Sequence, residues 1–109
     1  MSVYIKLQRP DGTLIANFPG EDNIGIAQMA KNNGIEFPTS CGIGACGVCK
    51  CTIISGKEHI QIDKISPPTR ELARDDEGNF EEVFACIGGI KKESLQDTNT
   101  YEIILEKNM

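Results

Sequence analysis

Cysteine is the residue type in this chain whose number and spacing could do chemistry. Four of the five cysteines lie in residues 39–51, which read TSCGIGACGVCKC. Three of them, Cys41, Cys46 and Cys49, follow the spacing C-x4-C-x2-C, and Cys86 stands alone further along. Three close thiolates with one distant thiolate are a known ligand pattern of the [2Fe–2S] cluster, in which each iron takes two protein thiolates beside the bridging sulfides. The pattern predicts that these four cysteines ligate such a cluster.

The residues between these cysteines are small enough to let the chain wrap closely around a cluster. Glycine has no Cβ and adopts positive φ at no steric cost, and alanine is the next smallest residue. Backbone amides that point at the sulfurs stabilise the negative charge there and tune the reduction potential. We therefore expect the residues of the loop to bind the cofactor: Gly42, Ile43, Gly44, Ala45 and Gly47.

Other uses of the cysteines fit the sequence less well. Zinc sites usually pair two C-x2–4-C motifs or combine cysteines with histidines, so a zinc-stabilised interaction module is kept as the alternative. A disulfide framework is disfavoured, because five cysteines is an odd number and the start, MSVYIKLQRPDG, lacks a secretory segment. A Rieske centre is excluded because it needs two histidine ligands and His59 is the only histidine. We expect an exposed, ordinary His59.

Cys51 is the fifth cysteine and lies on a strand expected over residues 48–54. Side chains alternate along a strand, so Cys51 points the same way as Cys49. This predicts a buried, inert thiol behind the cluster. The alternative is a substitute ligand or a redox-reactive thiol.

The stretch GIEFPTSCGIGACGVCKC resembles the cluster loop of plant-type (chloroplast-type) [2Fe–2S] ferredoxins, including its glycines and the Pro-x-Ser before the first cysteine. The resemblance is close over about residues 22–54 and at Cys86, and loose elsewhere. It implies the β-grasp fold and a one-electron carrier. A site of this type suggests a low potential, on the order of −400 mV.

Three departures from the family pattern bear on the partner. Gly42 stands where the family usually has arginine or a similar residue, and GACGVC also resembles ferredoxin-like domains inside larger oxidoreductases. Thirty-six residues separate Cys49 from Cys86, and GGIKKESLQDTN replaces a usually short connection before the last strand. The x4 spacing argues against the adrenodoxin-type branch, which has one more residue there. The enlarged loops lie where partners would dock.

The pattern of apolar residues predicts the elements that position the cysteines. Alternation over residues 3–8, and again at Leu14, Ala16 and Phe18, predicts a hairpin. A helix should follow, and the residues that define it are an Asp22 or Asn23 cap, an apolar face of Ile26, Met29 and Ala30, and an end near Asn33 with Gly34 as the C′ residue.

The second half of the chain predicts further strands and one short helix. Residues 83–85 should deliver Cys86, and Tyr101, Ile103 and Leu105 alternate as a last strand. Ser66-Pro67-Pro68 should start a helical turn to about Arg74, with Leu72 as its anchor, and residues 91–100 should form a polar excursion. We therefore expect one α+β domain over residues 1–109, a mixed sheet crossed by one main helix.

The net charge of the chain limits the kinds of partner that it can bind. Sixteen acidic and eleven basic residues give a formal net charge of −5, which argues against nucleic acid. An acidic surface suits docking to a basic redox partner such as a ferredoxin reductase or an electron-accepting enzyme. Five acids precede the Cys86 strand, and they form either a docking face or a solvated loop: Asp75, Asp76, Glu77, Glu81 and Glu82.

No segment is long and apolar enough to cross a membrane, so we expect a soluble protein of the cytoplasm or an equivalent reducing compartment. Nothing in the sequence demands an oligomer, so we also expect a monomer. No general acid, base or activated nucleophile is evident, so we expect a carrier and not an enzyme. Two further redox roles stay open. One is a dedicated electron-transfer subunit of one oxidoreductase complex, and the other is a sensor whose cluster state controls a partner.

Overall fold

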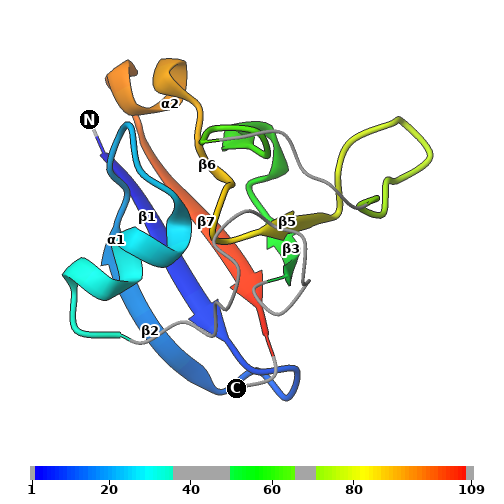
Figure 1. Ribbon diagram of the computed structural model, residues 1–109, viewed down its shortest axis with the longest axis horizontal. Coiled ribbons are helices and arrows are strands. Elements are labelled where there is room, and N and C mark those ends of the chain that lie inside the picture. The colour runs from blue at the N-terminus through cyan, green and yellow to red at the C-terminus, as the bar shows by residue number, and fades with distance from the viewer. Residues whose placement is uncertain (1, 36–49, 66–70, 108–109) are drawn as a thin grey trace.

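The computed structural model describes residues 2–35, 50–65 and 71–107 (Figure 1). The elements in chain order are β1 (Ser2–Gln8), β2 (Leu14–Pro19), α1 (Ile26–Asn32), β3 (Lys50–Ser55), the 3-10 helix η1 (Lys57–His59), β4 (Ile60–Gln61), β5 (Glu82–Phe84), β6 (Gly89–Ile90), α2 (Lys92–Gln96) and β7 (Thr100–Glu106). None of the helices in these ranges is long and apolar enough to cross a membrane.

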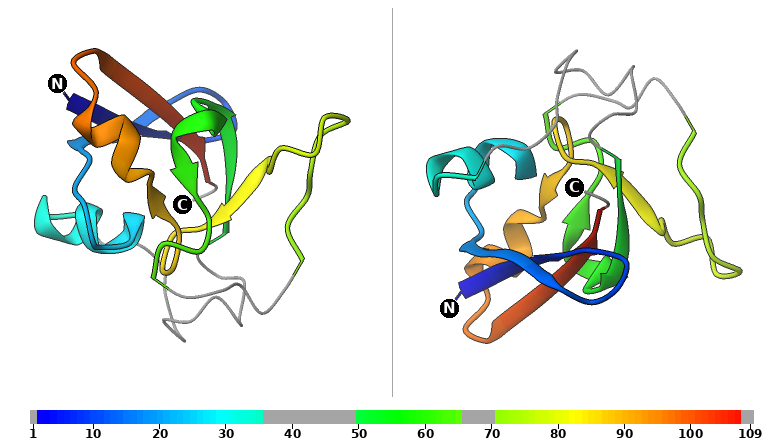
Figure 2. Two further views of the ribbon diagram at one scale, coloured as in Figure 1. Left: turned by 90° about the horizontal axis from the view of Figure 1, so that it is seen from above. Right: turned by 90° about the horizontal axis from the view of Figure 1, so that it is seen from below.

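A five-stranded mixed sheet forms the frame of the molecule, with strand order β2-β1-β7-β3-β5. The first and last strands, β1 and β7, pair in parallel at its centre, and the other pairs are antiparallel. A parallel pair needs a crossover, and here that crossover contains the rest of the chain. Helices α1 and α2 lie on the same side of the β1–β7 strands (Figure 2). The predicted α+β arrangement with one main helix is confirmed.

The hydrophobic core fills the space between this sheet and α1. Val3, Ile5 and Leu7 are buried on one face of β1 as the alternation predicts, and Ile26 and Met29 of α1 pack against that layer. Each fully buried aliphatic side chain contributes about 1.5–3 kcal/mol of transfer free energy. The same core continues to the segment that contains Cys86, where the buried residues are Val83, Phe84, Ala85 and Ile87.

The prediction that Leu14 shares a face with Ala16 and Phe18 is wrong. Phe18 is 1% exposed, whereas Leu14 is 52% exposed. The β1–β2 pairing shifts between Leu7 and Gln8, because Leu7 faces Ala16 and Gln8 faces Leu14. The shift inserts one extra residue into β2, and an extra residue reverses which face the following side chains point to.

Helix α1 begins later than its predicted cap. Gly25 is the N-cap, without a side-chain hydrogen bond, and neither Asp22 nor Asn23 caps the helix. Asn23 instead adopts the left-handed conformation, with φ of 65°. The predicted end is confirmed, since Asn33 is the C-cap and Gly34 follows with φ of 81°.

In the second half of the chain one local prediction is wrong, and one short helix was not predicted. The described part of the predicted helical turn, residues 71–74, is not helical, and residues 66–70 lie outside the described residues. Leu72 is nevertheless buried, as predicted for an anchor. The polar excursion after residue 90 contains the short helix α2, whose Ser94 is buried. A five-residue helix has too few apolar positions to leave a periodic signal.

Candidate metal centre

Cys86 is the one predicted ligand that the structure describes. Cys41, Cys46 and Cys49, with the loop residues 42–47, lie outside the described residues. Cys86 lies in the turn after β5 and is half-buried, whereas its neighbours Ala85 and Ile87 are both 0% exposed. The turn is therefore anchored in the core on both sides of the cysteine, which limits where its side chain can go.

Backbone hydrogen bonds close this turn tightly. The Phe84 carbonyl accepts from the amides of Ile87, at 3.2 Å, and Gly88, at 2.7 Å. The Ile87 carbonyl accepts from the Ile65 amide at 2.9 Å. Glycine is needed at position 88, because a Cβ there would lie 2.2 Å from Val83 Cγ2.

The start of α1 is joined to the same turn. The Ile26 amide donates to the Gly88 carbonyl at 2.9 Å, and the Ala27 amide donates to the Ala85 carbonyl at 2.8 Å. The first amides of a helix have no partner within the helix, so these bonds also satisfy two donors that would otherwise lack one. Helix α1 and the Cys86 turn are thus held as one unit.

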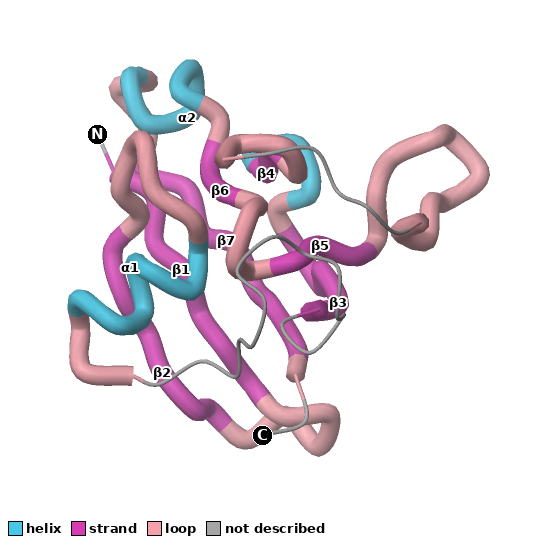
Figure 3. Tube along the Cα trace, viewed as in Figure 1, coloured by secondary structure: helices cyan, strands magenta, loops and turns pink. Residues whose placement is uncertain are grey.

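Strand β3 connects the other end of the cysteine loop to Cys86. Lys50 directly follows Cys49 in the sequence and pairs with Phe84, two residues before Cys86. The Lys50 ammonium lies 3.3 Å from Glu82 of β5, and the Lys50 carbonyl accepts from Lys107 Nζ at 3.0 Å. The first described residue after the cysteine loop therefore lies beside the strand that leads to Cys86 (Figure 3).

Cys51 is 1% exposed and belongs to the hydrophobic core. It pairs with Val83 across the β3–β5 ladder. The prediction of a buried thiol is confirmed, and the contrast with the half-buried Cys86 separates the two cysteines by environment.

The donor set fits an iron–sulfur cluster. Iron in such clusters takes four thiolates in all from the protein, and the sequence offers four in the matching spacing besides the buried Cys51. Cys86, the distant member, is half-buried on a turn whose backbone is fixed by hydrogen bonds. Fixed ligands and hydrogen-bonded surroundings are what tune a metal site.

The acidic loop before β5 is partly bound up in its own structure. Asp75 Oδ1 accepts from the amides of Glu77, at 2.9 Å, and Asn79, at 3.0 Å. Lys57 Nζ lies 3.2 Å from Asp75 and 3.6 Å from Glu81. The Asn79 amide is the main cause of the lowered pKa of Asp75, with Lys57 as a further cause.

Two carboxylates at the tip of this loop face solvent. Asp76 and Glu77 are exposed, and the loop projects from the body of the molecule (Figure 1). Glu82, by contrast, lies beside Lys50 and accepts from the Ala73 amide at 2.8 Å. The loop therefore combines an internal scaffold with an exposed acidic tip.

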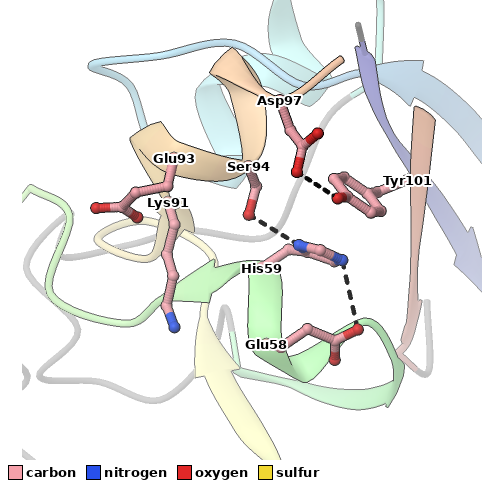
Figure 4. Close-up of a pocket in the computed structure, with 7 residues that line it drawn as sticks. All are labelled: Glu58, His59, Lys91, Glu93, Ser94, Asp97 and Tyr101. Carbon is pink, nitrogen blue, oxygen red and sulfur yellow. Dashed lines mark hydrogen bonds and ion pairs between the residues drawn. The ribbon is translucent and has the colours of Figure 1, made fainter. Parts of the chain in front are cut away.

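His59 lies in a pocket that the sequence did not predict (Figure 4). The prediction of an exposed His59 is wrong, because its side chain is 12% exposed. Its ring stacks on Tyr101 with centroids 4.1 Å apart, and its Nδ1 is 2.8 Å from Ser94 Oγ. These partners come from η1, α2 and β7, and no local sequence signal joins elements so far apart in the chain.

The pocket has a volume of about 310 Å³ and mixed charge. Its lining residues are Glu58, His59, Lys91, Glu93, Ser94, Asp97 and Tyr101. The Tyr101 hydroxyl donates to Asp97 Oδ2 at 2.5 Å. This bond lowers the pKa of Asp97, with help from the Asn99 amide, and raises the pKa of Tyr101.

A family model described as the 2Fe-2S iron-sulfur cluster binding domain matches residues 9–88 of this chain. The match covers most of the chain and includes all four predicted ligand cysteines. The chain belongs to this family, and its cofactor is a [2Fe–2S] cluster. The predicted β-grasp fold and plant-type resemblance are confirmed.

A curated relative supports the same assignment. The 2Fe-2S ferredoxin-5 of Aquifex aeolicus (strain VF5) is 46% identical over 46 residues, which are 41% of this chain and 48% of the relative. The chain thus spans about half the length of that relative. The protein contains a [2Fe–2S] ferredoxin-type electron-transfer domain.

Solved structures share the fold at low sequence identity. Pectocin M2 has a TM-score of 0.60 and 18% identity, and the match covers 94% of this chain and 32% of that one. Phthalate dioxygenase reductase has a TM-score of 0.57 and 21% identity, and the match covers 98% of this chain and 27% of that one. A structure of Pseudomonas putida CBB5 NdmA with the ferredoxin domain of NdmD has a TM-score of 0.54 and 18% identity. That match covers 95% of this chain and 99% of the matched chain.

Proposed function

We propose that this protein is a one-electron carrier whose cluster is ligated by Cys41, Cys46, Cys49 and Cys86. When bound, the cluster takes up and gives off one electron at a time. The observation that supports the ligand set most is the β3–β5 pairing. It sets Lys50, the residue after Cys49, beside the strand that leads to the half-buried Cys86.

The chain's own residues would then hold the cofactor. Backbone amides of the loop, at Gly42, Ile43, Gly44, Ala45 and Gly47, would donate hydrogen bonds to the sulfurs. The α1 start and the Phe84 carbonyl fix the Cys86 turn. The proposal makes the chain a carrier and not an enzyme.

A matched pair of serine substitutions tests the ligand set. Cys86→Ser should lower the iron content or shift the visible and EPR spectra, because oxygen replaces a thiolate on one iron. Cys51→Ser replaces a thiol in the core by a hydroxyl of similar size, and it should leave the spectra nearly unchanged. Equal loss of iron in both variants would refute the assignment.

We infer that electrons pass between a reductase and a redox enzyme that dock on an acidic face. Asp76 and Glu77 are exposed carboxylates at the tip of the projecting loop that precedes β5, the strand that leads to Cys86. Opposite charge on a partner would speed encounter, and salt would weaken the effect. Neutralising these two carboxylates should therefore slow electron transfer to a basic acceptor.

We also propose that residues 1–109 form one domain. The first and last strands of the chain pair along their whole length, from Ser2 with Thr100 to Gln8 with Glu106. Thiolate ligands suit a reducing compartment such as the cytoplasm.

A second candidate is a dedicated electron-transfer subunit of one oxidoreductase complex. The family match ends at residue 88, so α2 and β7 lie beyond it, and the chain covers only 27% of phthalate dioxygenase reductase. Co-purification with a stoichiometric large partner would favour this candidate, and isolation as a free monomer would favour the free carrier. Membership in the cluster-binding family disfavours a zinc-stabilised module.

A further inference from the structure

Gly25, the N-cap of helix α1, lies against the Cys86 turn. A Cβ at this position would lie 2.8 Å from the Cys86 carbonyl oxygen and 3.0 Å from the Ala85 carbonyl oxygen. Side-chain Cβ atoms are essentially never found within 3.0 Å of a heavy atom from a residue that is not adjacent in the chain. The bare Cα of Gly25 is therefore what allows the helix to approach the backbone of Cys86 this closely.

The approach cannot be relaxed easily from the helix side. The Ile26 and Ala27 amides bond to the Gly88 and Ala85 carbonyls, which flank Cys86 in the sequence. Ile26 is also 0% exposed, so a retreat of the helix start would break two hydrogen bonds and uncover core surface.

The turn is equally constrained. Ala85 and Ile87 are fully buried, and the Phe84 carbonyl holds the amides of Ile87 and Gly88. A side chain at position 25 would thus act on the Cys86 peptide itself, because its neighbours on both sides are fixed.

Helix capping does not explain the glycine. Gly25 is the N-cap with φ of −77° and ψ of 163°, an extended conformation open to any residue, and it makes no side-chain cap bond. Serine, aspartate or asparagine would cap the helix better. Space beside Cys86, and not backbone conformation, is the physical requirement at this position.

We propose that Gly25 is a positioning residue for the Cys86 thiolate. This inference rests on the proposed ligand role of Cys86. Because Gly25 has no side chain, the start of α1 packs directly against the Cys86 peptide, and this contact fixes the position of the Cys86 thiol. Residues that orient a metal ligand change metal retention and electronic structure when they are substituted, even though they never touch the metal.

The test compares Gly25→Ala with Gly20→Ala in the full chain loaded with its cluster. Gly20 is the matched control, because a Cβ there would meet Ile90 Cδ1 at 2.2 Å and the Val3 carbonyl at 3.0 Å, so it crowds the fold without touching Cys86. The readouts are the rate of iron release to a chelator and the EPR g values after reduction with dithionite.

We expect Gly25→Ala to release iron roughly tenfold faster than the parent chain and to shift the g values. Gly20→Ala should keep the parental g values and a release rate within about twofold, whatever its effect on unfolding. If the two variants behave alike in both readouts, the inference is overturned.

Two further measurements keep the outcome clear. Cys86→Ser is measured in parallel: if its spectra match the parent chain, the ligand role fails and the inference with it. If Cys86→Ser alters the spectra and Gly25→Ala does not, only the inference fails.

Should Gly25→Ala not fold, glycine-labelled parent protein is examined by NMR. Paramagnetic broadening of the Gly25 signals, with sharp Gly20 signals, supports the contact, and equally sharp signals overturn it.

Discussion

Single residues decide what each cysteine can do. Cys51 and Cys86 have the same side chain, yet Cys51 is a core residue and Cys86 is half-buried on a turn. The parity of Cys51 on its strand was enough to predict its burial from the sequence. The reason for glycine at position 25 was not predictable, because the atoms that exclude a side chain there belong to Ala85 and Cys86, some sixty residues away.

The Tyr101–Asp97 pair makes a prediction at the residue scale. The hydrogen bond lowers the pKa of Asp97 and raises the pKa of Tyr101. A lowered carboxyl pKa gives stability above its ordinary value of 3.8 that is lost as pH falls through the lowered pKa. A raised phenol pKa gives stability below its ordinary value of 10.0 that is lost as pH rises through the raised pKa.

Tyr101→Phe should therefore unfold at a lower temperature than the parent chain between these two limits. The ring that stacks on His59 is kept, so the substitution removes only the hydroxyl. The difference in melting temperature should shrink below about pH 4 and above about pH 10. Tyr4→Phe is the control, because Tyr4 lies on β1 and is 41% exposed. A Tyr101→Phe difference that stays constant from acid to alkaline pH would contradict the account.

At the scale of elements, alternation predicted well and irregular features did not. Strands β1 and β7 follow the alternation of their apolar residues, because one face of each is buried. The bulge in β2 was not predicted, because the residue types of the strand are the same with or without it. It shows only in which residues of β1 and β2 pair. The pocket at His59 escaped because α2, η1 and β7 meet only through the fold.

The acidic loop carries the prediction that belongs to this scale. Asp76→Asn with Glu77→Gln removes two exposed charges and leaves the bonds of Asp75 to the loop backbone in place. Reduced protein should then transfer electrons to cytochrome c, a basic acceptor, several-fold more slowly at low salt, because steering is weaker. The rate should also depend less on salt.

The control for this loop is the double variant Glu21→Gln with Glu93→Gln. Both residues are exposed, and the variant removes the same charge from the α1 and α2 regions. If both double variants slow the reaction equally, net charge and not the loop controls docking. If neither does, the acidic tip is a solvated loop.

At the scale of the whole molecule, the fold brings Lys50, the residue after Cys49, beside the strand that leads to Cys86. The sequence separates Cys49 from Cys86 by thirty-six residues, and the β3–β5 pairing sets Lys50 opposite Phe84. The spacing and resemblance of the cysteine loop predicted the cofactor, and the family match supports it. The place of α1 against the Cys86 turn depends on tertiary packing and could not be read from the spacing.

The partner is the part of the function that spacing cannot specify. Docking depends on the shape and charge of surfaces, and the docking face that we propose lies in one of the enlarged segments, the acidic loop before Cys86. The sequence does not distinguish the exposed carboxylates Asp76 and Glu77 from their acidic neighbours. Only the fold shows that Asp75 bonds to the backbone of its own loop, and that Glu82 bonds to Ala73 and lies beside Lys50.

The measurement that tests the central claim most directly is the visible and EPR spectrum of anaerobically purified protein, before and after dithionite. A [2Fe–2S] carrier should be red-brown and EPR-silent when oxidised. Reduction by one electron should bleach it and produce a rhombic S = 1/2 signal. A folded, colourless protein that contains zinc, lacks acid-labile sulfide and stays EPR-silent after dithionite would contradict the account.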